Sequence, residues 1–321
     1  MMKYKIGKKQ GEEIIHKVKG WRGLWVRPKK VDFKSQNIQR PLGWRKDKYD
    51  SRDYLHRRLA VIPDSVDLSP YLPKVRDQGQ VGSCVGFGIG GNITATAKQQ
   101  GVYLEWFSPT WIYNGARFLE GTLNEDAGAY PRDGFEWLVS KGGLLEHFWP
   151  YNPTKLDKTP PPSKFDAEAA KYPVLSYYRV TGGAEGICSA LAAGHFVSIG
   201  TPWFMSWVDI HADGILPEIN AGSQCVGGHE TCLYGYDKIK KIFYGMNSWG
   251  PGWGRDGHYA MPMSALAVFG SFGGYDAHYV EVIWRPGPEP PPPTPDCKCS
   301  YWLPNIFRWI ACLFGGPKRC K

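Results

Sequence analysis

The sequence predicts an α+β fold with two lobes, because helical patterns come first along the chain and strand patterns follow them. The helical patterns lie mainly in residues 84–141, and the strand patterns begin near residue 196. The 321 residues include 39 glycines, 26 prolines and 14 tryptophans, which indicates many loops packed with aromatic side chains. A hydrophobic content of 42% and a charged content of 21% are ordinary for a soluble globular protein.

The first half of the chain carries the helical signals. The first expected helix contains several glycines, each costing about 1 kcal/mol relative to alanine, which predicts a helix packed tightly inside the protein. Ser108-Pro109 opens the second helix, and Gly142-Gly143 ends the third. The expected helices are residues 84–100, 110–119, 131–141 and, after a proline-rich connection, 186–193.

The second half carries the strand signals. Two of the strand patterns lie close together in the sequence and read as an antiparallel pair joined by a short turn. Such a hairpin brings residues on both sides of it back into proximity. The expected strands are residues 196–200, 231–236, 241–246 and 257–261.

The N-terminal region differs from the rest in charge. Residues 1–60 hold 18 lysines and arginines against 6 acidic residues, a net charge of +12, so the remainder carries −3 of the total of +9. This basic arm is a candidate for contact with an anionic partner, or else a solvated extension around the fold. The expected organisation is a basic or prosegment-like extension (1–61), a globular domain (62–285), a proline-rich linker (286–296) and a cysteine-rich aromatic and basic tail (297–321).

The ends of the chain give few signals of location. No apolar run reaches the roughly 20 residues that span a bilayer, and residues 1–20 have no apolar signal-peptide core. Location therefore stays open, with the cytoplasm and a virion as alternatives. Four of the eight cysteines lie in the last 25 residues, in a tail that could serve as an interfacial anchor, a stapled knob or a docking peptide. We expect this tail to mediate attachment.

Cys84 is the candidate nucleophile, because the thiolate of a cysteine at a helix N-terminus is stabilised by the partial positive charge there. A nearby imidazolium lowers the thiol pKa further, and His229 lies 145 residues downstream, at an interval typical of papain-type enzymes. Asn247 follows across the predicted hairpin and is placed to orient the imidazole. Gln78, six residues before Cys84, can donate its side-chain N–H to an oxyanion beside the backbone N–H of Cys84.

These residues carry a family resemblance. Gln78-Gly79…Gly82-Ser83-Cys84, then Gly228-His229, then the segment from Asn247 to Gly254 make the chain resemble the papain-like cysteine peptidases over about residues 62–262. The resemblance implies the two-lobed papain-like fold, with the catalytic cysteine in the helical lobe and the catalytic histidine and asparagine in an antiparallel β-rich lobe. It implies a cysteine endopeptidase that acts on a peptide or protein substrate and needs no cofactor.

The resemblance also implies substrate-binding residues. Gly128 and Ala129 lie in the segment whose backbone pairs with bound peptide, and Trp249 shields the histidine–asparagine hydrogen bond. Gly200 and Glu230 are expected at the walls of the pocket for the second residue on the acyl side of the cleaved bond. A carboxylate opposite a missing side chain would favour a long basic residue there, unless Glu230 pairs with an internal arginine or lysine.

The chain departs from the family pattern at several positions. Val81 stands where many members have a disulfide-forming cysteine, and Val85-Gly86-Phe87 replaces the usual Trp-Ala-Phe. Cys225 and Cys232 flank His229, but their spacing is not a strong zinc pattern and a metal would block the base, so no metal is expected. The alternatives to an endopeptidase are an amidase or transpeptidase acting on cell-wall peptides, and a catalytically silent protein that binds peptides.

Overall fold

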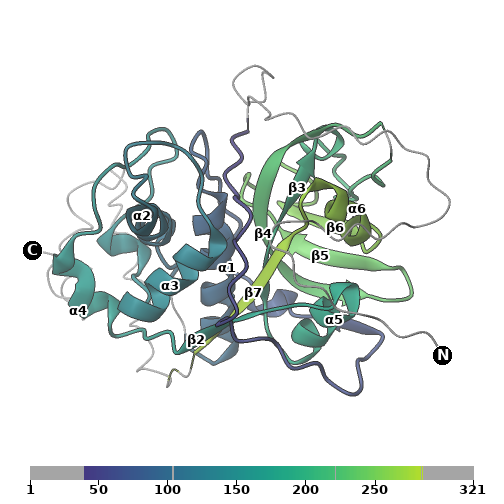
Figure 1. The fold of residues 1–321 in the computed structure, drawn as a ribbon, viewed down its shortest axis with the longest axis horizontal. Helices are drawn as coiled ribbons and strands as arrows, with labels where there is room; N and C mark the ends of the chain where they lie inside the picture. The colour runs from purple at the N-terminus through teal and green to yellow at the C-terminus, as the bar shows by residue number, and fades with distance from the viewer. Residues whose placement is uncertain (1–39, 103–104, 221, 283, 285–321) are drawn as a thin grey trace, which may run out of the picture. The chain divides into compact units, whose positions relative to one another are not determined.

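The fold is seen in a computed structural model that describes residues 40–284, except for residues 103–104, 221 and 283. Three helices, α1 (Cys84–Gln99), α2 (Pro109–Glu120) and α3 (Pro131–Lys141), pack together, and α1 also packs against an antiparallel sheet (Figure 1). The expected α+β architecture, helices first and strands second, is confirmed.

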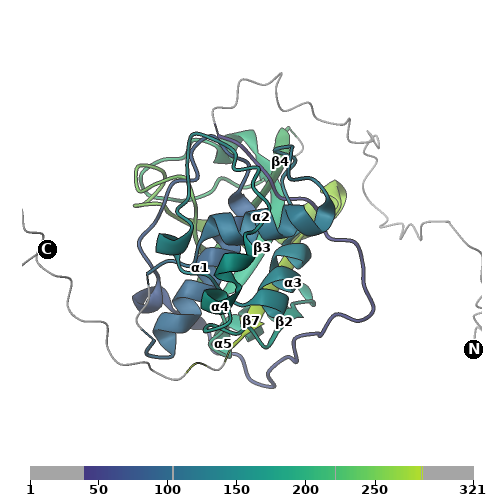
Figure 2. The same ribbon diagram turned by 90° about the vertical axis from the view of Figure 1, so that its left-hand side faces the viewer.

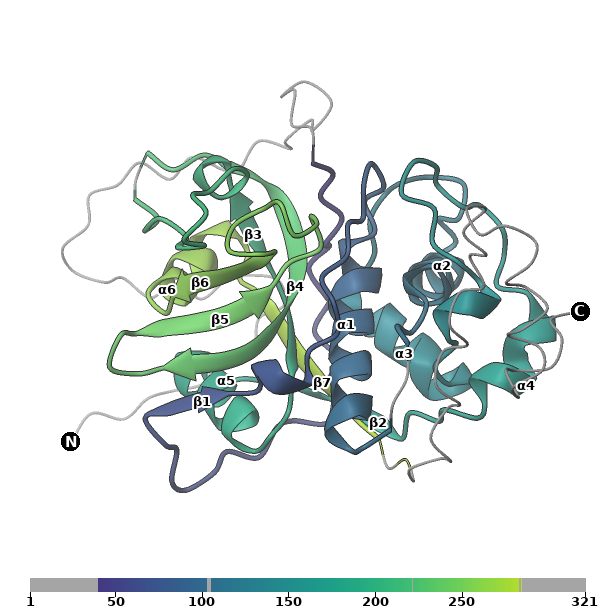
Figure 3. The ribbon, with the colours of Figure 1, turned by 180° about the vertical axis from the view of Figure 1, so that it is seen from behind.

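Helix α1 lies between helices α2 and α3 on one side and the sheet on the other, and its glycines permit this position (Figure 3). A Cβ atom at Gly86 would lie 2.6 Å from the carbonyl oxygen of Pro109, and one at Gly88 would lie 2.8 Å from the Glu230 side chain. The residues from Cys84 to Ala97 are all buried. The prediction of a tightly packed glycine-rich helix is therefore confirmed.

Helix α3 begins and ends where the sequence predicts, and α2 extends one residue beyond its predicted range at each end. Ser108 caps α2 by accepting a hydrogen bond from the Trp111 N–H, and Gly121 ends it in the left-handed conformation with φ of 70°. Gly142 ends α3 with φ of 88°, a value that favours glycine. Seen from the helical side, α2 and α3 lie in front of the sheet (Figure 2).

The sheet is larger than the sequence predicts. Its strands run in the order β2-β7-β3-β4-β5-β6, with β1 paired to β4, and every pairing is antiparallel. The predicted hairpin corresponds to β4 and β5, in which Cys232 pairs with Met246. The strands are β1 (Ser65–Asp67), β2 (Ser176–Arg179), β3 (Val197–Phe204), β4 (Cys225–Asp237), β5 (Ile242–Met246), β6 (His258–Pro262) and β7 (Asp276–Glu281).

The sequence gives no signal for β1, β2 and β7, and it predicts β3 and β4 too short. The missing signals have a physical cause, because β1, β2 and β7 are short and two of them are partly exposed, so no clear alternation appears. The remaining helices are α4 (Asp166–Ala169), α5 (Gly183–Ala192), predicted over residues 186–193, and α6 (Ala265–Phe269).

The described part of the N-terminal extension runs along the boundary between the helices and the sheet, drawn in purple (Figure 1). It forms isolated β-bridges at Trp44 with Ala129 and at Leu55 with Arg179. Among the described residues, no helix is long and apolar enough to cross a membrane. The first 39 residues, the proline-rich linker and the C-terminal tail lie outside the described residues, so their predicted roles stay predictions.

Candidate active site

Cys84 is the first residue of α1, and its side chain is fully buried. The backbone N–H groups of Glu230 and Gly43 donate hydrogen bonds toward its thiol. The first of these groups follows His229 directly in β4, so the thiol lies beside the part of β4 that carries the histidine. The nucleophile predicted at a helix N-terminus therefore lies near the strand that carries the predicted base, and the pairing of Cys84 with His229 stays a prediction.

His229 and Asn247 form the expected pair. The Nε2 atom of His229 lies 2.7 Å from Oδ1 of Asn247, across the hairpin that β4 and β5 make. The amide oxygen is an acceptor, so Nε2 carries a proton and Nδ1 is the basic nitrogen of the neutral ring. Nδ1 has no hydrogen-bond partner among the described residues, although it is buried.

Aromatic rings enclose the imidazole of His229. The Trp249 ring is stacked on it with centroids 4.5 Å apart, and the Trp203 ring meets it edge-on at 4.7 Å. Arg40 lies over the Trp249 ring, with its guanidinium carbon 5.3 Å from the ring centroid. The histidine–asparagine hydrogen bond is therefore kept away from water.

Gln78 is buried and its amide is fixed by two neighbours. Ser248 donates its hydroxyl to Oε1 of Gln78 at 2.6 Å, so Nε2 must point the other way. Nε2 donates to the carbonyl oxygen of Val81 at 2.9 Å and to that of Pro41 at 3.1 Å. The donor predicted for an oxyanion is thus turned toward a backbone carbonyl of the N-terminal segment.

Burial sets the protonation of this site. It raises the pKa of Cys84 to about 12, and hydrogen bonds from the backbone of Glu230 and Gly43 offset only part of the rise. Burial also lowers the pKa of His229 to about 4, against the opposing effect of Asn247. In this state the thiol and the imidazole are both neutral at physiological pH.

The N-terminal segment of residues 40–53 crosses the site at Leu42–Arg45. The backbone N–H of Trp44 donates to Gly228 at 3.0 Å, that of Arg45 donates to Ala129 at 3.0 Å, and Ala129 donates to Gly43 at 2.8 Å. Gly128 permits this approach, because a Cβ there would lie 2.1 Å from the Gly43 carbonyl oxygen. Of the two residues predicted to pair with a substrate backbone, Ala129 pairs with the chain's own segment and Gly128 lies close against it.

The predicted pocket residues also meet this segment. A Cβ at Gly200 would lie 2.0 Å from the indole nitrogen of Trp44, and one at Gly228 would lie 2.3 Å from the indole ring. Glu230 points elsewhere: its side chain packs against Gly88 of α1 and is 1% exposed. Burial, followed by the charges of Asp47 and Asp276, raises its pKa well above the usual range, so Glu230 is protonated.

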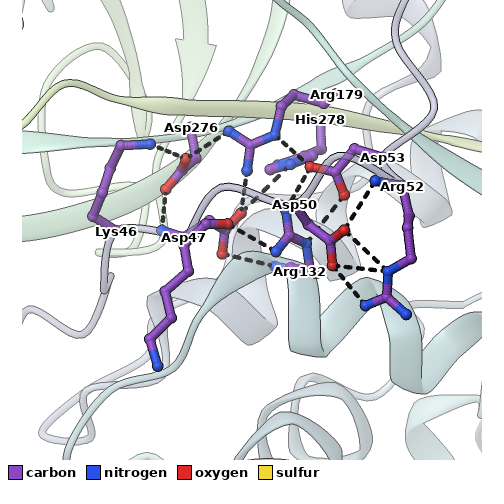
Figure 4. A network of polar contacts seen from close by, with 10 residues as sticks. Lys46, Asp47, Asp50, Arg52, Asp53, Arg132, Arg179, Asp276 and His278 are labelled. Carbon is purple, nitrogen blue, oxygen red and sulfur yellow. Dashed lines mark hydrogen bonds and ion pairs between the residues drawn. The ribbon is translucent and has the colours of Figure 1, made fainter. Parts of the chain in front are cut away.

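An ion-pair network ties the segment to the fold (Figure 4). Arg132 of α3 donates from two nitrogens to the Asp53 carboxylate, at 3.1 and 2.5 Å, and Arg179 of β2 donates to the same carboxylate at 2.9 Å. Arg179 also contacts Asp47 at 3.2 Å and Asp276 at 3.3 Å. Asp47 and Asp53 come from the segment, so two arginines of the fold hold it in place.

Sequence reasoning missed two residues that matter here, Trp44 and Asp276. The cluster around Gly43-Trp44 is visible in the sequence, but its position over the site depends on pairing with residues far along the chain. Asp276 is the first residue of β7, a strand that gives no sequence signal. Among the described residues, no group of three or more histidines, cysteines and acidic residues is placed to hold a metal ion.

Comparison with known proteins agrees with the resemblance to the papain-like cysteine peptidases. The sequence model of the papain family cysteine proteases matches residues 62–268. The chain is 30% identical over 263 residues to the uncharacterized peptidase C1-like protein L477 of Acanthamoeba polyphaga mimivirus, covering 73% of this chain and 85% of that protein. It is 29% identical to the thiol protease aleurain of Arabidopsis thaliana, covering 64% of this chain but only 57% of that protein. Among solved structures, xylellain, a cysteine protease from Xylella fastidiosa, matches with a TM-score of 0.70 and 27% identity, over 77% of this chain and 97% of that one.

Proposed function

The chain belongs to the papain family of cysteine proteases, and from this premise we propose that it is a cysteine endopeptidase whose nucleophile is Cys84. The observation that carries the proposal is the hydrogen bond of His229 Nε2 to Asn247 Oδ1 at 2.7 Å. It leaves Nδ1 of His229 as the basic nitrogen, beside the strand residue that contacts the Cys84 thiol. An imidazole fixed in this tautomer is suited to take the thiol proton.

The proposed reaction has two steps. The sulfur of Cys84 attacks the substrate carbonyl carbon while His229 Nδ1 holds the thiol proton, and the carbonyl oxygen gains the negative charge. The C–N bond then breaks, and the amine leaves with the proton from His229. Water then gives a proton to His229 and attacks the thioester carbon. The C–S bond breaks, a carboxylic acid leaves, and His229 returns its proton to the Cys84 sulfur.

The remaining residues position these groups. Asn247 fixes the ring of His229, and Trp249 keeps their hydrogen bond dry. Gln78 Nε2 and the Cys84 backbone N–H are the proposed oxyanion donors, and the Ser248 hydroxyl holds the Gln78 amide in the required orientation. Losing one such donor typically costs about 10²- to 10³-fold in rate.

The segment Leu42–Arg45 stands where a substrate would bind, so the described conformation corresponds to a covered form of the enzyme. Its backbone takes the partners Ala129 and Gly228, and Pro41 takes the amide of Gln78. The neutral thiol and imidazole belong to this covered form. Displacement of the segment would admit water and substrate and allow the ion pair of thiolate and imidazolium to form.

The test is hydrolysis of casein and of fluorogenic peptides by the full-length chain carrying Trp44→Ala. This substitution removes the indole that packs against Gly200 and Gly228, so the N-terminal segment should dissociate from the site more readily. The proposal predicts hydrolysis that is lost on adding Cys84→Ala and falls about 10²- to 10³-fold on adding Gln78→Ala. Covalent labelling of Cys84 by an epoxysuccinyl inhibitor without hydrolysis of peptides would favour the amidase or transpeptidase. Neither labelling nor hydrolysis would favour the silent peptide-binding protein.

A further inference from the structure

The loop of residues 78–83 carries the two proposed oxyanion donors at its ends. The side chain of Gln78 supplies one donor, and the backbone N–H of Cys84, in the peptide bond that follows Ser83, supplies the other. Both donors must point at the same oxygen atom, so their relative placement decides how well they stabilise its charge. The cysteines among the described residues are all free, so no disulfide between them restrains this loop.

The hydroxyl group of Tyr151 joins the two ends of the loop. It donates a hydrogen bond to the backbone carbonyl oxygen of Gln78 at 2.7 Å, and it lies 2.6 Å from the hydroxyl oxygen of Ser83. A phenol has one proton to donate and a carbonyl oxygen can only accept, so Tyr151 donates to Gln78 and accepts from Ser83. One oxygen atom therefore contacts both the residue that carries the first donor and the residue whose peptide bond carries the second.

Tyr151 is itself held in place. Its backbone N–H donates to the Glu146 carboxylate at 2.9 Å, and Arg76 donates to the same oxygen at 2.7 Å. The Tyr151 ring meets the ring of Phe87 in α1 edge-on, with centroids 4.8 Å apart. Burial raises the pKa of the Tyr151 hydroxyl, so the group keeps the proton that it donates to Gln78.

Other contacts hold the loop at single points. The Asp126 carboxylate accepts a hydrogen bond from the backbone N–H of Gly82 at 2.9 Å, which fixes the middle of the loop. The backbone carbonyl of Ser248 accepts from the backbone N–H of Gln78 at 2.8 Å, which fixes the first end. Among the described residues, the side chain that forms hydrogen bonds with both ends is that of Tyr151.

We infer, on the basis of the proposed peptidase function, that Tyr151 is a positioning residue that holds Gln78 Nε2 and the Cys84 backbone N–H at the spacing required by one oxyanion. Its hydroxyl is used by the loop and contacts neither Cys84 nor His229 in a hydrogen bond. Loss of this hydroxyl should therefore leave the nucleophile and the base in place. It should weaken the steps in which the substrate carbonyl oxygen gains its charge.

The test compares two reactions of Cys84 in the full-length chain with Trp44→Ala. The first is hydrolysis of a fluorogenic peptide amide, measured as kcat and KM, and the second is alkylation of Cys84 by iodoacetamide. Alkylation displaces iodide at a saturated carbon and forms no oxyanion, so its rate reports on the nucleophile and the base. Adding Tyr151→Phe should lower kcat about tenfold to a hundredfold and change KM and the alkylation rate by less than about twofold.

Tyr236→Phe is the matched control. Tyr236 also donates its hydroxyl to a backbone carbonyl, that of Pro63 at 2.9 Å, but outside the loop. This substitution should leave kcat, KM and the alkylation rate within about twofold of the parent values.

Ser83→Ala removes the hydroxyl that donates to Tyr151 and retains the hydrogen bond from Tyr151 to Gln78. It should lower kcat by less than Tyr151→Phe does, again with an unchanged alkylation rate, and it serves alone if Tyr151→Phe does not fold. In a Gln78→Ala protein, Tyr151→Phe should lower kcat by a smaller factor than in the parent, because one of the two donors that it places is already missing.

An unchanged kcat, an equal loss of hydrolysis and alkylation, or effects of Tyr151→Phe and Gln78→Ala that simply multiply would overturn the inference and leave the peptidase function standing. Absence of peptide hydrolysis by the Trp44→Ala parent would instead overturn the proposed function.

Discussion

Gln78 Nε2 donates a hydrogen bond to the carbonyl oxygen of Pro41, 3.1 Å away, and so one proposed oxyanion donor is already engaged by the chain's own N-terminal segment. Trp44, three residues later, fills the side-chain space at Gly200, and its backbone takes the carbonyl of Gly228. The N-terminal segment therefore occupies both the Gln78 side-chain donor and the Gly228 backbone carbonyl in the same conformation. The molecule therefore combines two linked features, a papain-type site and an N-terminal segment that covers it.

The first prediction concerns the ion pairs that hold the segment. Asp53→Asn should weaken its contacts with Arg132 and Arg179, because a nearly buried guanidinium pair loses its charged partner, a change that typically costs several kcal/mol. Limited trypsin cleavage after Lys46 or Lys48 should become at least tenfold faster. The rate is measured by mass spectrometry of the fragments.

Asp50→Asn is the matched control, since it makes the same charge change three residues away. Asp50 pairs with Arg52 of the same segment, and that pair is largely exposed. Exposed pairs contribute little, so cleavage should stay close to the wild-type rate. Equal acceleration by both substitutions would show that net charge, and not the Asp53 contacts, holds the segment.

The second prediction concerns the thiol. Burial raises the pKa of Cys84 to about 12 and lowers the pKa of His229 to about 4, so the covered protein has no thiolate at this position near neutral pH. Thiolate absorbance at 240 nm, taken as the difference from Cys84→Ala, should show no step between pH 4 and 9. Trp44→Ala should introduce a step below pH 8, because the thiolate can then pair with the imidazolium.

Tyr49→Ala provides the control for the second prediction, since Tyr49 lies in the same segment and is 87% exposed. The dependence of thiolate absorbance on pH in the Tyr49→Ala protein should match that of the wild type. A Cys84-dependent step below pH 8 in the wild type would contradict the neutral covered state.

The third prediction concerns Glu230, whose pKa burial raises well above its usual range. The folded state binds this proton more tightly than the unfolded state, so its stabilising effect is complete below pH 4.5 and is lost as pH rises through the folded pKa. Each unit of raised pKa corresponds to about 1.4 kcal/mol. Thermal unfolding at pH 6 and pH 9 should therefore show a larger loss of stability for the wild type than for Glu230→Gln.

Glu125→Gln is the control for that series, because Glu125 is exposed. The thermal stability of Glu125→Gln should equal that of the wild type at pH 6 and at pH 9. A loss of stability on alkalinisation that Glu230→Gln does not reduce would mean that Glu230 is ionised in the fold.

Local signals in the sequence predict the parts of the fold that depend on neighbouring residues. Ser108 and Gly142 mark helix ends because capping and left-handed φ values are local requirements. The hairpin that brings Asn247 to His229 is likewise a short-range feature. The candidate nucleophile and base lie 145 residues apart, and they were chosen by motifs and an interval typical of papain-type enzymes and not by a local signal.

The parts that the sequence did not predict depend on pairings between distant residues. Asp276 lies beside Gly200 because β7 pairs with β3, and no local pattern announces that register. Trp44 covers the site because its backbone pairs with Gly228, 184 positions away in the sequence. The sequence instead drew attention to Glu230 as the pocket carboxylate, since a side chain's direction depends on what packs against it.

The most direct test of the account is the rate at which an epoxysuccinyl inhibitor forms a covalent adduct at Cys84, located by mass spectrometry in the folded full-length protein. We predict one adduct, at Cys84, that forms slowly in the wild type and at least tenfold faster with Trp44→Ala, and that is lost with His229→Ala. No adduct at Cys84 in the Trp44→Ala protein, or an adduct whose rate does not depend on His229, would contradict it.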